Sequence, residues 1–231
     1  MCFSANASFA GGLIISTIGV ITVREVHKPS QIIFASIPLF FGLQQIVEGV
    51  LWITLPIHQF LPLQKFATYF FLMMADVIWP MLIPISVLFM ETNKKKKKAI
   101  WVFLALGLSL SAYYGWCLIF YNVNPQIIGY HIKYLNDFPT YLANPAFVVY
   151  LAATITPLFI SSIKRTHLLG ILMFLSCLIT AIFFRQYLTS VWCFFAALIS
   201  AVIFWILRDS KKKFKIDKLE LLKAKLKSVT G

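Results

Sequence analysis

Long stretches of apolar residues, separated by short polar segments, occupy almost the whole chain. The stretches are continuous rather than alternating, which favours helices over the strands of a membrane barrel. A helix that crosses the hydrocarbon core of a bilayer needs about 20 predominantly apolar residues. Seven stretches qualify, at residues 8–23, 31–55, 66–90, 99–121, 141–163, 168–184 and 188–207. The pattern therefore predicts an all-α integral membrane protein, a bundle of seven transmembrane helices.

Composition supports this class of protein. Hydrophobic residues make up 60% of the 231 residues, charged residues only 13%, and the mean hydropathy is +0.82. Soluble domains contain about 25% charged residues, so too few charges are present to cover a soluble surface. A soluble enzyme, a disordered tail and a disulfide-stapled secreted domain are thereby excluded.

The basic residues are distributed unevenly between the two sides of the predicted bundle. Of the 21 lysines and arginines, 18 follow the first, third, fifth or seventh segment, and the other side carries only Lys65, Lys133 and Arg185. Because cytoplasmic loops are enriched in Lys and Arg, this predicts an outside amino terminus and a cytoplasmic carboxyl terminus. The net charge of +13 is then mainly a topology signal, and no groove-binding motif indicates nucleic acid.

The chain divides into a seven-helix transmembrane domain, residues 1–207, and a basic amphipathic cytoplasmic tail, residues 208–231. Apolar residues in the tail recur at helical spacing among eight lysines, which predicts a helix lying on the inner leaflet. The tail and the basic loops can attract anionic lipid headgroups. A protein partner or a homo-oligomer also remains open.

Glu48 is the first of two acids within the apolar segments. Gln44, Glu48 and Trp52 recur every four residues and so share one helix face, and Gln45 lies beside them. An ionisable group at the bilayer centre costs at least about 2.5–3.5 kcal/mol, so it is a functional candidate by default. The alternative is a neutral, hydrogen-bonded residue that ties helices together.

Asp76 is the second acid and lies near the middle of the third segment. The same two interpretations apply to it, and no lysine or arginine lies at mid-membrane to pair with either acid. Arg185, at the outer end of the sixth segment, is the nearest cationic candidate by depth.

Further polar groups collect in the outer half of the predicted bundle. They include Tyr113 in the fourth segment, His131 in the long loop 122–139, and Trp192 in the seventh segment. Together with Glu48 they suggest an outward-facing ligand pocket, although membrane aromatics also form interfacial belts. Cys2, His131 and Cys193 are candidate metal ligands, but they lack ligand spacing, so no metal site is predicted and no cofactor is identified.

Several short motifs resemble an uncharacterised family, a domain of unknown function, of bacterial seven-helix membrane proteins. The resemblance extends from the first to the seventh segment. It rests on MCFSANASF at 1–9, QQIVEG at 44–49 with Trp52, WP at 79–80, HIKY at 131–134, SS at 161–162 and SVWCFFAA at 190–197. It implies a bacterial inner-membrane protein without an assigned activity, and it singles out Cys2, Glu48, Trp52, His131, Trp192 and Cys193 for testing. Asp76 is not part of this resemblance.

Three functions are compatible with these residues. The first is a non-enzymatic protein that binds a small ligand, lipid or ion in the outward-facing pocket around Glu48. The second is a small proton-coupled transporter that uses Glu48 and Asp76, against which the absence of a visible repeat and of broken helices counts. The third is a membrane-embedded enzyme acting on lipid or redox substrates, against which the missing catalytic constellations count.

Overall fold

The computed structural model describes the backbone of residues 4–230, and their side chains except at 58, 213, 215, 217–219 and 221–230. Within that part of the chain, seven helical segments are long and apolar enough to cross a membrane. The predicted number of helices is thus confirmed. These segments are Ala5–Arg24, Pro29–Thr54, Leu61–Met90, Lys94–Phe120, Thr140–Ile160, Lys164–Phe183 and Arg185–Lys212.

Five of the segments contain a single α-helix, two of them with a short 3₁₀ turn at the start. These helices are α1 (Ala5–Arg24), α2 (Ile32–Thr54), α5 (Lys94–Phe120), α6 (Ala143–Ile160) and α7 (Lys164–Phe183). The third segment is divided into α3 (Leu61–Leu72), a π-helical turn η3 (Met73–Ile78) and α4 (Trp79–Met90). The seventh is divided into α8 (Leu188–Ile199) and α9 (Ala201–Thr230). The 3₁₀ turns are η1 (Pro29–Gln31), η2 (His58–Phe60), η4 (Thr140–Leu142) and η5 (Arg185–Tyr187).

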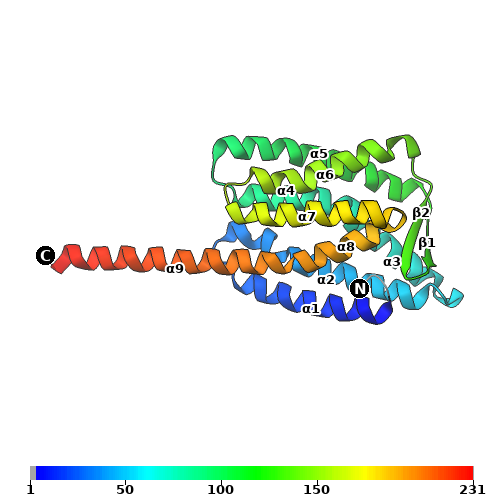
Figure 1. Ribbon diagram of the computed structural model, residues 1–231, viewed down its shortest axis with the longest axis horizontal. Helices are drawn as coiled ribbons and strands as arrows, with labels where there is room; N and C mark the ends of the chain where they lie inside the picture. Colours follow the sequence, from blue (N-terminus) through cyan, green and yellow to red (C-terminus); the bar gives the residue numbers. More distant parts are fainter. Residues whose placement is uncertain (1–3, 231) are drawn as a thin grey trace.

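The loop predicted at 122–139 contains a β-hairpin that the apolar pattern did not reveal. Strands β1 (Val123–Ile128) and β2 (His131–Asn136) pair antiparallel. Gly129 has a φ of +60° at the first of the two turn positions, where a type II′ hairpin turn requires glycine. The hairpin crosses one end of the bundle (Figure 1), and Ile132 of β2 is fully buried.

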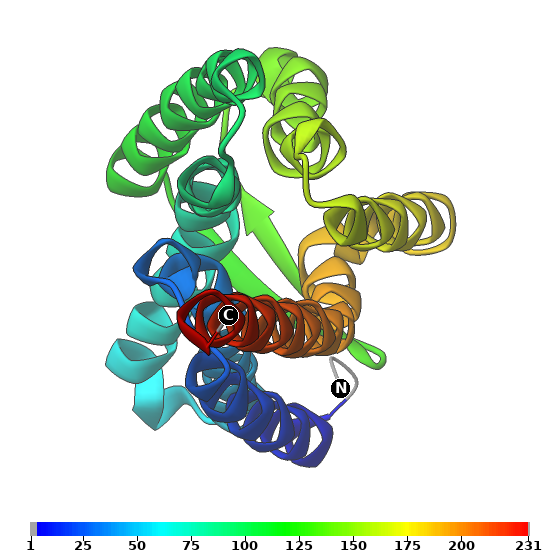
Figure 2. The same ribbon diagram turned by 90° about the vertical axis from the view of Figure 1, so that its left-hand side faces the viewer.

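The two ends of the bundle differ in charge. One end carries the hairpin, and we call it the hairpin end. At the other, the basic end, lie the loops that contain Lys28, Lys94–Lys98 and Lys164, and from it α9 projects well beyond the other helices (Figure 1). Viewed along the bundle from the basic end, the hairpin lies behind the helices (Figure 2). Helix α9 continues the seventh segment in the same direction, and no proline or glycine interrupts Ala201–Thr230. The location of the tail on the membrane surface stays a prediction.

Helices α1 and α2 pack closely against each other. A Cβ atom added at Gly42 would lie 2.2 Å from Oγ of Ser16 and 2.8 Å from its backbone nitrogen, and one added at Gly12 would lie 2.7 Å from Ile46. Small residues let membrane helices approach until their backbones touch. The glycines therefore serve helix packing.

Gly42→Ala is expected to lower the stability of the bundle. The added methyl group must displace Ser16 and part of α1, and such overpacking costs about 1–3 kcal/mol. Thermal unfolding of the purified protein in detergent measures the effect. Gly115→Ala in α5 is the matched control, because a Cβ there meets nothing within 4 Å. An equal midpoint for both variants would contradict the proposed contact.

Candidate functional site

The third membrane segment changes its hydrogen-bond pattern halfway along its length. The backbone N–H of Trp79 donates to the carbonyl of Met74, five residues earlier, which is the pattern of a π-turn. The next N–H would serve the carbonyl of Ala75, but residue 80 is proline and has none. The hydroxyl of Tyr150 in α6 donates to this free carbonyl at 2.7 Å.

Helix α5 contacts two further backbone carbonyls near the π-turn, donating a hydrogen bond to one and packing closely against the other. The hydroxyl of Ser111 donates to the carbonyl of Val77 at 2.6 Å. The carbonyl of Pro80 lacks its usual helical donor because Pro84 has no N–H, and a Cβ added at Gly107 would lie only 2.0 Å from this oxygen. The interruption thus draws α5 and α6 against the third segment.

A cavity of about 100 Å³ lies beside the π-turn, near the middle of the third segment. One buried water needs about 10–15 Å³, so the cavity has room for several waters or a small molecule. We call it the Asp76 cavity. Its walls come from the π-turn, α5, α6 and α8, and its lining residues are Ala75, Asp76, Tyr114, Phe147, Tyr150, Leu188, Thr189, Trp192 and Cys193.

One polar group in the described part of this lining is buried without a protein partner. The indole N–H of Trp192 has no acceptor among the described residues, although the residue is only 7% exposed. Asp76, in the middle of the third segment, is half-buried, and its carboxyl makes no hydrogen bond or ion pair among the described residues. Buried polar groups are normally satisfied, so Trp192 gives the cavity wall an unused hydrogen-bond donor.

A network of buried side chains lies directly behind the cavity and holds α2, α4 and α8 together. The indole N–H of Trp79 donates to Oε1 of Gln44 at 2.9 Å, and Nε2 of Gln44 lies 3.3 Å from Sγ of Cys193. The same amide nitrogen also reaches the carbonyl of Phe71, at 3.4 Å. Trp79 stacks on Phe41 with 3.8 Å between ring centroids. Cys193 is therefore held by Gln44 while it faces the cavity.

Glu48 belongs to the same network. It is fully buried and accepts hydrogen bonds from the hydroxyl of Ser190 in α8 and from Nε2 of Gln45, the latter at 3.5 Å. It thus links α2 to α8, and it does not line the Asp76 cavity. The sequence analysis centred the pocket on Glu48, whereas the cavity described here opens beside Asp76.

The remaining candidates lie closer to the hairpin end. His131 packs on Tyr187 and Phe184, with 4.6 Å and 5.4 Å between ring centroids, and burial lowers the pKa of its imidazole. Arg185 is exposed in the adjacent η5 turn. Trp52 is half-buried and its indole N–H has no partner among the described residues. None of the three reaches the Asp76 cavity.

Tyr113 lies next to a residue that lines the Asp76 cavity, and the described cysteines are buried. Tyr113 is half-buried and its ring lies 5.2 Å from that of Tyr114, which lines the cavity. Cys2 lies outside the described residues, and Cys117, Cys177 and Cys193 are free and buried. Within the described part of the chain, no three His, Cys, Asp or Glu side chains gather as metal ligands would.

Sequence reasoning missed most of the aromatic lining. Tyr114, Phe147 and Tyr150 are ordinary residues for a membrane helix and carry no distinguishing spacing. Pro80 did hold one signal, because a proline inside a helix frees a carbonyl that some neighbouring donor must satisfy. It could not indicate that this donor is Tyr150.

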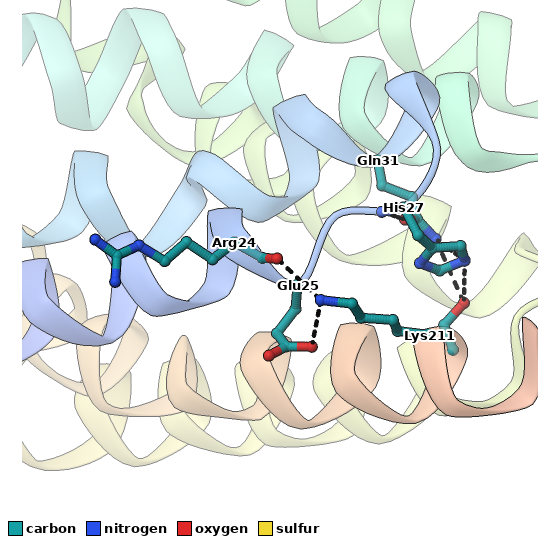
Figure 3. A network of polar contacts seen from close by, with 6 residues as sticks. Arg24, Glu25, His27, Gln31 and Lys211 are labelled. Carbon is teal, nitrogen blue, oxygen red and sulfur yellow. Dashed lines mark hydrogen bonds and ion pairs between the residues drawn. The ribbon is translucent and has the colours of Figure 1, made fainter. Parts of the chain in front are cut away.

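At the basic end, polar contacts hold α9 against the other helices. Nζ of Lys211 forms an ion pair with Glu25 at 3.2 Å and donates to the carbonyl of Arg24 (Figure 3). Nε2 of Gln31 lies 3.5 Å from Nε2 of His27 and donates to the hydroxyl of Ser210 in α9 at 3.4 Å. In α7, Arg165 pairs with Asp209 at 2.9 Å and stacks over Trp205.

Glu91 is a buried carboxylate that the sequence analysis did not consider. It is 1% exposed and accepts hydrogen bonds from the backbone N–H groups of Thr92 and Asn93 at 2.9 Å and of Ser162 at 2.6 Å. It therefore joins the α4–α5 turn to the α6–α7 turn. Burial disfavours its charge, but the hydrogen bonds from Asn93, Ser162 and Thr92 outweigh this and lower the pKa of Glu91.

Comparison with known proteins identifies a family but no activity. The model of a family of unknown function, DUF6629, matches residues 1–217. No curated protein and no solved structure matches the chain. The resemblance to an uncharacterised family is thereby confirmed.

Glu91→Gln is expected to destabilise the protein at neutral pH. A depressed carboxyl pKa means that the folded state prefers the charged form, so its contribution is present above the ordinary carboxyl value of 4.5 and is lost as the pH falls through the lowered value. Losing the charge-assisted hydrogen bonds costs about 1–3 kcal/mol.

Thermal unfolding between about pH 7 and pH 3 tests this. The midpoints of wild type and variant should differ most at neutral pH and converge in acid. Glu220→Gln, an exposed position on α9, serves as the control and should follow wild type throughout. A gap that stays constant with pH would show that Glu91 acts through packing rather than charge.

Proposed function

The chain belongs to the DUF6629 family of unknown function, and we propose that it is a multi-pass protein of the bacterial inner membrane that binds a small molecule in the Asp76 cavity. The observation that carries this proposal is the combination, in one cavity near the middle of the segment, of the buried Trp192 indole N–H without an acceptor and the half-buried Asp76 carboxyl, which makes no hydrogen bond among the described residues.

The two buried acids support different roles. Glu48 is bonded across helices to Ser190, which is what a residue that ties helices together requires. Asp76 has no such bond among the described residues, so a structural role leaves its cost of at least about 2.5–3.5 kcal/mol without compensation. A ligand that interacts with Asp76 supplies the compensation.

The surrounding structure favours a site formed before the ligand arrives. Gln44 fixes both Trp79 and Cys193, and the Tyr150 hydroxyl is held on the Ala75 carbonyl. A site whose side chains are already ordered loses less entropy when it binds. The contacts that close the break in the third segment thus also hold the cavity wall.

A carrier is the second candidate, and one observation favours it. The sequence analysis counted the absence of broken helices against transport. Leu61–Met90 is one helical segment, but its π-turn Met73–Ile78 lies beside the cavity. Such π-turns within helices occur frequently at functional sites. In this variant of the proposal, Asp76 binds the cargo and movement of the third segment exposes it to either side.

Cys193 reports whether small molecules reach the cavity. In a variant that keeps only this cysteine, with the other three changed to Ala, we expect neutral methyl methanethiosulfonate to modify the thiol in the folded protein. Cys193 lines the Asp76 cavity. Cys177, kept alone in the matched control, is 3% exposed and does not line this cavity.

Intact-protein mass spectrometry follows the reaction over time. Because accessibility governs thiol modification, Cys193 should react about tenfold faster than Cys177 or more. Equal and slow modification of both would mean that the cavity is closed to small molecules, and the proposed binding function would be abandoned.

We also propose that the basic end faces the cytoplasm, where its lysines and arginines contact anionic lipid headgroups. A phosphatase that folds only outside the cytoplasm, fused after Gly231, should be inactive. The same enzyme fused into the hairpin at Gly129 should be active, because the hairpin end then faces outward. The reverse pattern would refute the orientation.

A further inference from the structure

The lining of the Asp76 cavity combines aromatic side chains with one acid and, among the described residues, contains no cationic side chain. Four of its lining residues are aromatic, and they come from three helices: Tyr114 from α5, Phe147 and Tyr150 from α6, and Trp192 from α8. Asp76 is the one ionisable acid among them, and no lysine, arginine or histidine is part of the described lining. The cavity therefore offers negative charge and the electron-rich faces of aromatic rings.

Two of the rings, those of Tyr150 and Trp192, meet at an angle and are held in place by the surrounding structure. The rings of Tyr150 and Trp192 lie 5.4 Å apart at an interplanar angle of 62°. The hydroxyl of Tyr150 is held by the carbonyl of Ala75, and Trp192 is 7% exposed and packed in the core of the bundle. Neither ring needs to be rearranged to receive a ligand.

Asp76 requires a positive charge in order to ionise at this depth. A carboxylate inside the bilayer is stabilised by a cation close to it, and the described part of the chain places none beside Asp76. A bound cation would supply this charge.

Aromatic faces select among cations. Sodium and calcium ions need a shell of several oxygen ligands. The side chains of this lining offer one carboxyl and the hydroxyls of Tyr114, Tyr150 and Thr189, and that of Tyr150 already donates to the Ala75 carbonyl. Alkylammonium groups bind the faces of Trp, Tyr and Phe instead. The volume, about 100 Å³, is well below the roughly 300–1,000 Å³ of pockets for drug-sized ligands.

We propose that the Asp76 cavity binds a small organic cation, a methylated ammonium or an alkylamine of similar size. Asp76 pairs with the charge, and the rings of Trp192, Tyr150, Tyr114 and Phe147 contact the alkyl groups. This inference rests on the proposed function and specifies its ligand class.

Protection of Cys193 from modification tests the ligand class directly. The protein that keeps only Cys193 is treated with methyl methanethiosulfonate in the presence of tetramethylammonium chloride. Sodium chloride at equal ionic strength controls for salt, and tert-butanol supplies a neutral molecule of similar shape. We expect tetramethylammonium to slow the reaction about fivefold or more at saturation, and neither control to do so.

Two variants assign the effect to the cavity. Asp76→Asn should abolish protection by tetramethylammonium while Cys193 still reacts, and it should fold because the carboxyl makes no hydrogen bond among the described residues. Phe147→Leu keeps the charge but removes one aromatic face, and it should raise the half-protecting concentration about three- to tenfold. Circular dichroism and gel filtration verify that both variants are folded.

The outcomes separate this inference from the proposed function. If tert-butanol protects as well as tetramethylammonium, or if sodium chloride does, the cavity binds small molecules without selecting organic cations. Full protection retained in Phe147→Leu and in folded Asp76→Asn would overturn the inference in the same way. If Cys193 cannot be modified in any condition, the proposed function itself fails.

Discussion

Two prolines four residues apart in the third membrane segment, Pro80 and Pro84, determine how the surrounding helices pack. Inside a bilayer no water is available to satisfy a free backbone carbonyl, so each one needs a partner from the protein. Neighbouring helices place a hydroxyl group or a glycine next to each of these free carbonyls. The Tyr150 hydroxyl meets the carbonyl of Ala75, and Gly107 lets α5 approach that of Pro80. The Asp76 cavity lies where these adjustments leave the helices apart.

The polar side chains near the Asp76 cavity fall into two groups: one connects helices by hydrogen bonds, and the other lines the cavity. Gln44 and Glu48 use their hydrogen bonds to connect α2 with α4 and α8. The indole N–H of Trp192 has no acceptor among the described residues, and the half-buried Asp76 makes no hydrogen bond there. The two acids, Glu48 and Asp76, thus differ in whether side chains from other helices reach them.

The sequence was sufficient to predict the helices, but not to predict which of their side chains meet in the folded bundle. Segments predicted at 8–23 and 66–90 correspond to Ala5–Arg24 and Leu61–Met90, because contact with lipid imposes an apolar pattern on each helix independently. Asp76 could be selected because a mid-membrane acid is costly. Tyr114 and Tyr150 could not, since aromatic residues are common in membrane helices and only tertiary contacts distinguish these two. The hairpin β1–β2 was missed because its alternation is short and mixed with polar residues.

The wall that α8 contributes has a consequence for the order of assembly during synthesis. The glycine contact between α1 and α2 involves neighbouring segments, so it can form while the ribosome is still making the rest of the chain. The partners of Glu48 and Gln44 in α8, by contrast, lie 142 and 149 residues further along the chain. The hydrogen bonds from α2 to α8 therefore cannot form until residues 188–199 have been inserted, whereas Gln44 can already bond Trp79 and the carbonyl of Phe71 in the third segment. The Asp76 cavity likewise acquires its α8 wall late in synthesis.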